Sequence, residues 1–137
     1  MKVLVDWLNA PERKTIGSCG YDLYCPRNIT LTKTPVTVDM GILLDKGDIP
    51  EGCFGLIAPR SSIGAKKGVH MRNTVGIIDS SYTMDTIKAT LYTDSDEPVE
   101  LKFNERILQM IIIPYVTMPN EIPPTEERVG GYGSTGK

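Results

Sequence analysis

Residues 86–93 read Thr-Ile-Lys-Ala-Thr-Leu-Tyr-Thr, and apolar and polar side chains alternate along this stretch. In an extended chain, successive side chains point to opposite faces. Ile87, Ala89 and Leu91 therefore share one face, while Lys88, Thr90 and Tyr92 share the other. This period of two predicts a β-strand with one face in the core and one face near solvent.

Further segments of the same kind surround this stretch, at residues 2–8, 36–44, 53–59 and 107–116. The last is apolar on both faces, which predicts a central strand covered on each side. Thirteen glycines and ten prolines punctuate the chain, and no stretch has ten or more residues of helical periodicity. These observations predict an all-β fold, a jelly-roll-like barrel or sandwich of short strands.

The composition is that of one ordinary globular domain. The chain has 137 residues, of which 40% are hydrophobic and 23% charged, enough to bury a core. Its net charge of −2 and pI near 5.4 argue against a nonspecific nucleic-acid or membrane-surface binder. No apolar run is long enough for a membrane span, and no secretory leader is recognisable, so a cytoplasmic location is expected.

Three cysteines are present, Cys19, Cys25 and Cys53. They are odd in number and lack metal-ligand spacing. We expect reduced thiols rather than a disulfide or a zinc site.

The chain changes character after Pro114. Residues 118–127 are rich in proline and acidic side chains, and residues 130–136 read Gly-Gly-Tyr-Gly-Ser-Thr-Gly. Such a segment cannot form a core of its own. We therefore divide the chain into a β-barrel core at 1–117 and a C-terminal arm at 118–137, which is either a disordered tail or a segment that docks on another surface.

Residues 58–68 offer groups that suit a phosphate. Arg60 follows the end of a predicted strand and presents a planar fork of donors, and Ser61 and Ser62 add hydroxyls and turn amides. The alternative is a polar turn that caps the next element.

Other polar side chains stand where chemistry or structure could use them. Asp79 ends an apolar run, with Tyr82 three residues later; it is either a general base beside an aromatic ring or an Asx turn that closes a hairpin. Asp22 and Gln109 each interrupt an apolar stretch, so each is either satisfied structurally or directed at a ligand.

Taken in order, these segments resemble the five motifs of the trimeric deoxyuridine triphosphatase family. The matching segments are residues 20–23 (Gly-Tyr-Asp-Leu), 59–62 (Pro-Arg-Ser-Ser), 76–82 (Gly-Ile-Ile-Asp-Ser-Ser-Tyr), 106–109 (Arg-Ile-Leu-Gln) and 130–136. The resemblance runs from about Thr15 to the last residue. It implies a jelly-roll homotrimer with three active sites, in which the arm closes over a neighbouring subunit's site.

The resemblance also implies a reaction and residue roles. Asp79 would activate the water that attacks the α-phosphorus of dUTP, giving dUMP and pyrophosphate. This would keep uracil out of DNA and supply dUMP for dTMP synthesis, in the cytoplasm or, for a viral chain, in the host-cell cytoplasm or nucleus. The substrate-binding residues would be Arg60, Ser61, Ser62, Asn73, Gly76, Tyr82, Gln109, Arg128, Tyr132, Ser134 and Thr135.

Within that set the resemblance assigns parts of the nucleotide. Tyr82 would stack on the deoxyribose and exclude a 2′-hydroxyl, and Asn73 with the backbone at Gly76 would read uracil. Tyr132 would stack on the base. The hydroxyls and guanidinium groups would hold the phosphates, with Arg128, Ser134 and Thr135 at the γ-phosphate. Asp22 would bind Mg²⁺ through water.

Some positions depart from the family pattern. Met84 stands where a glycine is usual, and the arm is one residue shorter between its arginine and its aromatic residue. Two other functions remain open: dCTP deamination, which needs a glutamate that the stretch 86–91 lacks, and a regulatory role with an unknown protein partner. Neither nucleic acid nor a membrane is expected as a partner.

Overall fold

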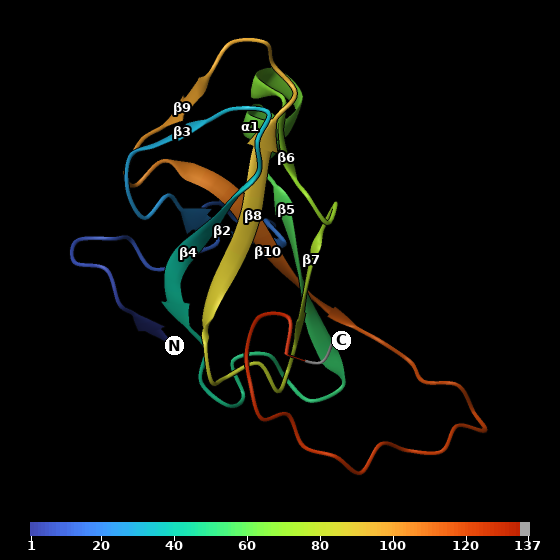
Figure 1. The fold of residues 1–137 in the computed structure, drawn as a ribbon. Coiled ribbons are helices and arrows are strands. Elements are labelled where there is room, and N and C mark those ends of the chain that lie inside the picture. Colours follow the sequence, from blue (N-terminus) through green and yellow to red (C-terminus); the bar gives the residue numbers. More distant parts are fainter. Residues whose placement is uncertain (135–137) are drawn as a thin grey trace.

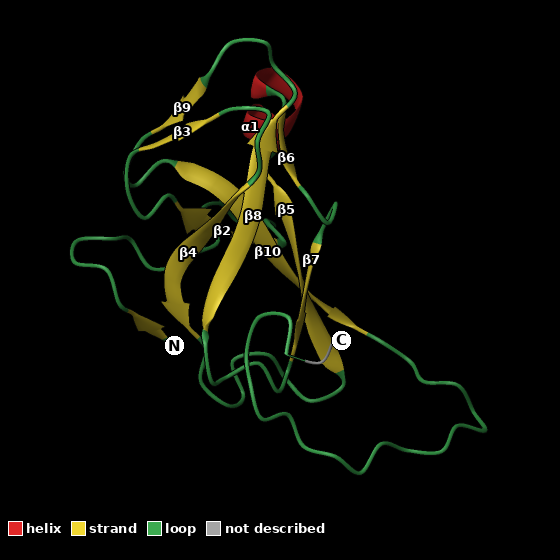
Figure 2. Ribbon diagram, in the orientation of Figure 1, coloured by secondary structure: helices red, strands yellow, loops and turns green. Residues whose placement is uncertain are grey.

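The computed structural model describes residues 1–134, and within them the fold is almost entirely β-structure (Figure 2). Thr135, one of the expected phosphate ligands, lies outside the described residues. The strands are β1 (Lys2–Val3), β2 (Gly20–Tyr24), β3 (Ile29–Leu31), β4 (Val36–Leu43), β5 (Cys53–Pro59), β6 (Val69–Met71), β7 (Gly76–Asp79), β8 (Thr86–Thr93), β9 (Val99–Leu101) and β10 (Arg106–Pro114), with one helix, α1 (Ser61–Lys67).

The strands form two four-stranded antiparallel sheets, in the orders β1-β4-β8-β6 and β2-β10-β5-β7, and β3 pairs with β9 in a small third sheet. Figure 1 shows the long strands β4, β8, β5 and β10 running through the body of the molecule. The apolar core lies between the two large sheets. The predicted jelly-roll-like all-β fold is confirmed.

Strand β8 spans residues 86–93 as predicted, and Ile87, Ala89 and Leu91 are fully buried. Strand β5 likewise has its predicted bounds. Strand β10 has the predicted central place, between β2 and β5. Its coverage is incomplete, because residues 111–113 are only half-buried in the single chain.

The pairing register of β10, β5 and β7 shows which face of their sheet is covered. Ile57 on β5 and Met110 on β10 are paired neighbours and point into the core. Their sequence neighbours Leu56 and Ile111 are also paired with each other, and because side chains alternate along a strand they point outward. Leu56 is in turn paired with Ile77 on β7, which is 56% exposed. The outer face of this sheet is thus an apolar surface that no other layer of residues 1–134 covers.

The N-terminal strand is shorter than expected. It ends at Val3, and Trp7 adopts a left-handed backbone angle, φ = 66°, with its side chain 90% exposed. A positive φ cannot continue a β-strand. The helix α1 was not predicted, because its seven residues are too few to show a helical period.

After β10 the chain leaves the core in a wide loop and returns beside β7 and β8 (Figure 1). Residues 115–130 contain no helix or strand. The division into a core at 1–117 and an arm at 118–137 stays a prediction, as does the exchange of the arm between subunits. In the part of the chain that the structure describes, no helix has the length and apolar character needed to cross a membrane.

Candidate functional site

A cavity of about 680 Å³ lies where β7 meets the returning arm. It brings together six residues expected to act on a nucleotide; we call it the Asp79 cavity. Those residues are Asn73, Gly76, Asp79, Tyr82, Arg128 and Tyr132. Its wall also includes Lys88 from β8, which the sequence had not indicated.

Asp79 is the last residue of β7, and its side chain is 56% exposed. Its backbone carbonyl accepts a hydrogen bond from the N–H of Tyr82 at 3.0 Å, which closes a tight turn. The predicted turn is present, but a backbone hydrogen bond closes it in place of the side-chain bond of an Asx turn, and the carboxylate of Asp79 lines the cavity. Gly76, at the start of β7, is packed closely: a Cβ there would lie 3.2 Å from Ile57 Cβ.

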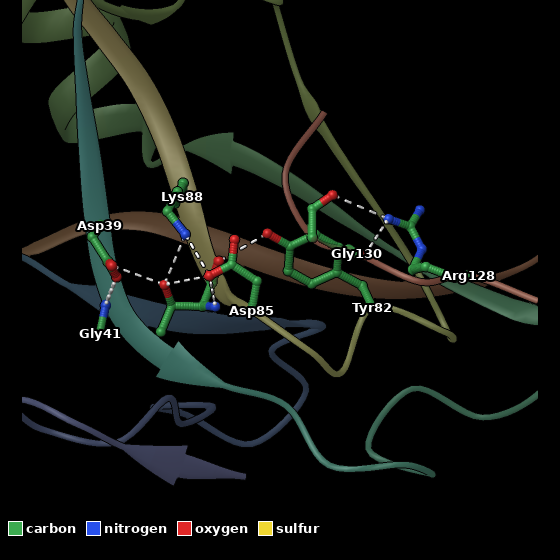
Figure 3. A network of polar contacts seen from close by, with 9 residues as sticks. Asp39, Gly41, Tyr82, Asp85, Lys88, Arg128 and Gly130 are labelled. Carbon is green, nitrogen blue, oxygen red and sulfur yellow. Dashed lines mark hydrogen bonds and ion pairs between the residues drawn. The ribbon is translucent and has the colours of Figure 1, made fainter. Parts of the chain in front are cut away.

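Arg128 crosses the cavity from the arm and pairs with Asp79. Its Nη2 lies 2.7 Å from Asp79 Oδ2, and its Nε donates to Ser81 Oγ at 3.2 Å. The guanidinium carbon lies 5.4 Å from the centre of the Tyr82 ring, within the range of a cation–π contact. Further bonds run to the carbonyl of Gly130 (Figure 3) and to Ser134 Oγ. The ion pair between Arg128 and Asp79 was not predicted from sequence.

Tyr82 is buried, and its hydroxyl donates to the carbonyl of Thr86 at 2.8 Å. Burial raises the pKa of Tyr82 to about 12, with the carboxylate of Asp85 adding to the effect. The phenol therefore stays protonated at any ordinary assay pH. A neutral ring of fixed orientation at the cavity wall suits stacking against a sugar.

A second cavity, of about 430 Å³, lies at the other end of the sheet and contains Asp22, Arg60, Ser61 and Gln109; we call it the Asp22 cavity. Asp22 is only 7% exposed. Its Oδ1 lies 3.1 Å from Arg60 Nε and its Oδ2 lies 3.1 Å from Arg106 Nη1. A buried carboxylate is costly unless paired, and two guanidinium groups satisfy this one. Arg106 begins the matching segment 106–109 and also lines this cavity, but no role was predicted for it from sequence.

The segment that was expected to bind phosphate, residues 60–62, is less uniform than expected. Arg60 is extended, with φ = −65° and ψ = 150°, and helix α1 begins at the next residue. Ser61 is exposed and lines the Asp22 cavity. Ser62 lines neither of the two cavities. Because Ser62 lies one residue further along a helix, its side chain is turned away from that of Ser61.

The two cavities share no lining residue in the single chain. The register places both on the outer face of one sheet: Asp22 is level with Gln109 and Ala58, while Asp79 is level with Phe54. From the rise along a strand and the spacing between strands, Asp22 and Asp79 lie on the order of 15–20 Å apart. One chain therefore holds two halves of the predicted site, separated by an apolar surface.

The single histidine of the chain, His70, has two structural partners. His70 Nε2 lies 2.6 Å from Asp94 Oδ2, and its ring stacks on Tyr92 at 5.3 Å. All three cysteines are free, as expected, and burial raises the pKa of the Cys25 thiol. Among residues 1–134 there is no group of three or more His, Cys, Asp or Glu side chains that could enclose a metal ion.

Comparison with known proteins shows which family the chain resembles. Residues 7–136 match the family model described as dUTPase. A deoxyuridine 5′-triphosphate nucleotidohydrolase of Hydrogenobaculum sp. is 37% identical over 99% of each chain. The crystal structure of a dUTPase from Streptococcus mutans has a TM-score of 0.69 at 26% identity, over 85% of this chain and 97% of that one.

A third comparison concerns the fold alone. A mutant dUTPase of phage phi11 of S. aureus, described as coordinating a structural Mg(II) ion, has a TM-score of 0.73 at 19% identity, over 92% of this chain and 95% of that one. The match to the family model covers nearly the whole chain, and the Hydrogenobaculum relative is matched along its whole length. The chain therefore belongs to the dUTPase family and is a dUTP diphosphatase.

Proposed function

We propose that the chain converts dUTP to dUMP and pyrophosphate by attack of water on the α-phosphorus, with Asp79 as the general base. The observation that carries this proposal is the Asp79 cavity, in which an exposed carboxylate stands beside an aromatic ring, an amide and an arginine. A positioned base typically contributes ~10²–10⁴-fold to such a proton transfer.

The walls of the Asp79 cavity support the expected reading of the nucleoside. Tyr82 would lie under the deoxyribose, and Asn73 with the backbone near Gly76 would bond the edge of uracil. Tyr132 would cover the base from the arm side. These roles rest on the shared cavity and on the family resemblance.

Through Arg128 the arm would also control the access of water to Asp79. In this structure its guanidinium covers the carboxylate of Asp79. A triphosphate offers a more highly charged partner for the same guanidinium donors. When Arg128 moves to the γ-phosphate, with Ser134 and Thr135, it leaves the carboxylate of Asp79 open to water. Substrate binding and activation of the base are then coupled through one side chain.

The phosphate chain would extend toward Arg60, Ser61 and Gln109 of an Asp22 cavity, and the part expected of Ser62 rests on the family resemblance alone. Because the two cavities of one chain face the same way and lie apart, we propose that the Asp22 cavity of one subunit completes the Asp79 cavity of a neighbour. The apolar surface between them, with Leu56, Ile77 and Ile111, is the surface that such an assembly would bury. A homotrimer is the closed assembly that the family resemblance implies.

Magnesium fits this arrangement only as an ion carried by the substrate. Among residues 1–134 the one buried carboxylate is that of Asp22, whose two oxygens each accept from a guanidinium group. A carboxylate has about four acceptor positions, so two remain for water molecules of a hydrated cation. Bound there, Mg²⁺ would neutralise charge on the leaving pyrophosphate. Arg60 and Arg106 fix the orientation of the Asp22 carboxylate for this contact.

The cellular role follows from the proposed reaction: removal of dUTP keeps uracil out of DNA, and dUMP supplies dTMP synthesis. This chemistry belongs in the cytoplasm, or in the host-cell cytoplasm or nucleus for a viral chain. The deaminase alternative is disfavoured because β8 presents Lys88 to the Asp79 cavity, where deamination requires a carboxylate.

The direct test is pyrophosphate release from dUTP, dTTP, dCTP and UTP, compared in the presence of magnesium. We expect hydrolysis of dUTP at a rate far above that of the other three. Equal rates with all four nucleotides would contradict the assigned base and sugar contacts. Formation of dUTP or dUMP from dCTP would support the deaminase alternative instead.

A further inference from the structure

The arm rests on two side chains, Asp85 in the turn before β8 and Thr90 on β8, and Lys88 on β8 holds Asp85 in place. We call these three residues the arm seat. None of them has a role in the proposed chemistry. Asp85 lies against Gly131 of the arm, and Thr90 contacts Tyr132, which lines the Asp79 cavity.

The contact at Asp85 leaves no room for a side chain on the arm. A Cβ built on Gly131 would lie 2.1 Å from Asp85 Cβ and 2.5 Å from its Oδ2. The pKa of Asp85 is lowered chiefly by the hydrogen bond from Lys88 and, as the smallest of its causes, by the backbone of Tyr132, the next residue of the arm. The arm backbone therefore lies directly against this side chain.

Asp85 is held firmly in this position. Its Oδ1 accepts from Lys88 Nζ at 2.6 Å and from the backbone N–H of Thr86 at 2.8 Å (Figure 3). The hydroxyl of Thr86 donates to Asp39 Oδ2 at 2.8 Å, which ties the group to β4. The hydrogen bond from Lys88 is the largest cause of the lowered pKa of Asp85. The carboxylate is thus ionised and oriented before the arm arrives.

Thr90 receives the arm's aromatic residue. Its Oγ1 lies 3.0 Å from the Tyr132 hydroxyl and 2.8 Å from Thr37 Oγ1 on β4. A hydroxyl that donates to Thr37 keeps its lone pairs to accept from the phenol. This bond fixes the direction of the Tyr132 ring, which lines the cavity together with Asn73.

We propose that Asp85, clamped by Lys88, and Thr90 are positioning residues that hold the arm closed over the Asp79 cavity. The inference rests on the proposed function, in which arm closure completes the site. A docking surface that is ordered in advance reduces the cost of ordering a flexible segment and favours its closed state. The arm seat can receive the arm of its own chain, as in this structure, or that of a neighbouring subunit.

The bond between Thr90 and Tyr132 is tested by a double-mutant cycle in kcat/KM for dUTP. Thr90→Val and Tyr132→Phe each remove one hydroxyl and keep the shape of the side chain. A neutral hydrogen bond corresponds to about a fivefold effect, so each variant should lose about fivefold. The double variant should lose no more than either single one. Two effects that multiply, or single effects below twofold, would overturn the role of Thr90.

The role of Asp85 is tested by amide hydrogen exchange of the arm with a non-cleavable dUTP analogue bound. Asp85→Ala should speed exchange around residues 128–134 by about tenfold, whereas Asp85→Asn, which keeps an acceptor, should restore most of the protection. Glu100→Ala is the matched control, because Glu100 pairs with Lys102 in the same way but does not touch the arm. Unchanged exchange in Asp85→Ala, or an equal change in the control, would overturn the proposal.

These measurements distinguish a failure of the proposed function from a failure of the arm-seat proposal. If the wild-type protein did not release pyrophosphate from dUTP, the proposed function would fail, and the exchange measurement would still report whether the arm uses the seat. If dUTP were hydrolysed and both the cycle and the exchange were insensitive to the variants, only the arm seat would be wrong.

Discussion

A carboxylate that activates water has to be reachable by solvent and fixed in direction. Asp79 meets these conditions, because its side chain is 56% exposed and its backbone is held in the turn with Tyr82. Asp79→Asn keeps the shape and removes the basic oxygen. We expect kcat for dUTP to fall by ~10²–10⁴-fold while the affinity for a non-cleavable analogue changes little.

The matched control is Asp96→Asn, an exposed aspartate that pairs with Lys33 away from both cavities. It should keep wild-type turnover. Turnover in Asp79→Asn equal to that of the control would remove Asp79 from the mechanism.

The tyrosines Tyr24 and Tyr82 predict a dependence of stability on alkaline pH. Burial raises the pKa of both to about 12, against about 10 in an unfolded chain. Their contribution to stability is therefore complete below about pH 10 and is lost as the pH rises through about 12. In a phenolate absorbance titration, these two of the six tyrosines should ionise last. Tyr82→Phe should remove part of that late phase; an unchanged late phase would contradict the assignment.

At the scale of elements, the alternation of apolar and polar side chains in the sequence was enough to locate the long strands. Strands β5 and β8 have their predicted bounds, and buried residues alternate with partly buried ones along the whole of β8 and at Gly55 and Ile57 in β5. Strands β3, β6 and β9 have three residues each, too few to show a period, and their pairing depends on partners distant in sequence. The helix α1 escaped prediction for the same reason of length.

The site could be predicted as a set of residues but not as an arrangement. The family resemblance indicated Asp79, Tyr82 and Arg128, and the structure places all three around one cavity. The pairing of Arg128 with Asp79 spans 49 residues of sequence, so no local pattern could indicate it. The same holds for the arm seat, whose residues lie on an ordinary alternating strand and the turn before it, and gain a role only when the arm returns.

The arm itself is expected to be dispensable for folding. Val129 is 86% exposed and Tyr132 is 45% exposed, so the arm buries little apolar surface. Deleting residues 126–137 should leave the circular dichroism spectrum and the melting temperature nearly unchanged. Catalysis should fall by roughly 10²-fold or more, because the base and the phosphates lose their cover. A deletion variant that no longer folds or assembles would show that the arm is structural.

At the scale of the whole molecule, one sheet links folding to function. Its inner face is the core, and its outer face carries an apolar surface with the Asp22 cavity at one end and the Asp79 cavity at the other. An apolar face that is left open in the single chain favours association between copies. The same association would bring two separated halves of a site together, so that only the assembled protein would be fully active.

The most direct test of this central claim is complementation between two inactive variants. Asp79→Asn disables one half of the site and Arg60→Gln the other; the two proteins are unfolded, mixed in equal amounts and refolded together. If each site combines Asp79 of one subunit with Arg60 of another, random assembly should restore about a quarter of the wild-type rate of dUTP hydrolysis. A mixture no more active than its separate components, while wild-type protein recovers fully under the same treatment, would show that the two cavities do not form one site across subunits.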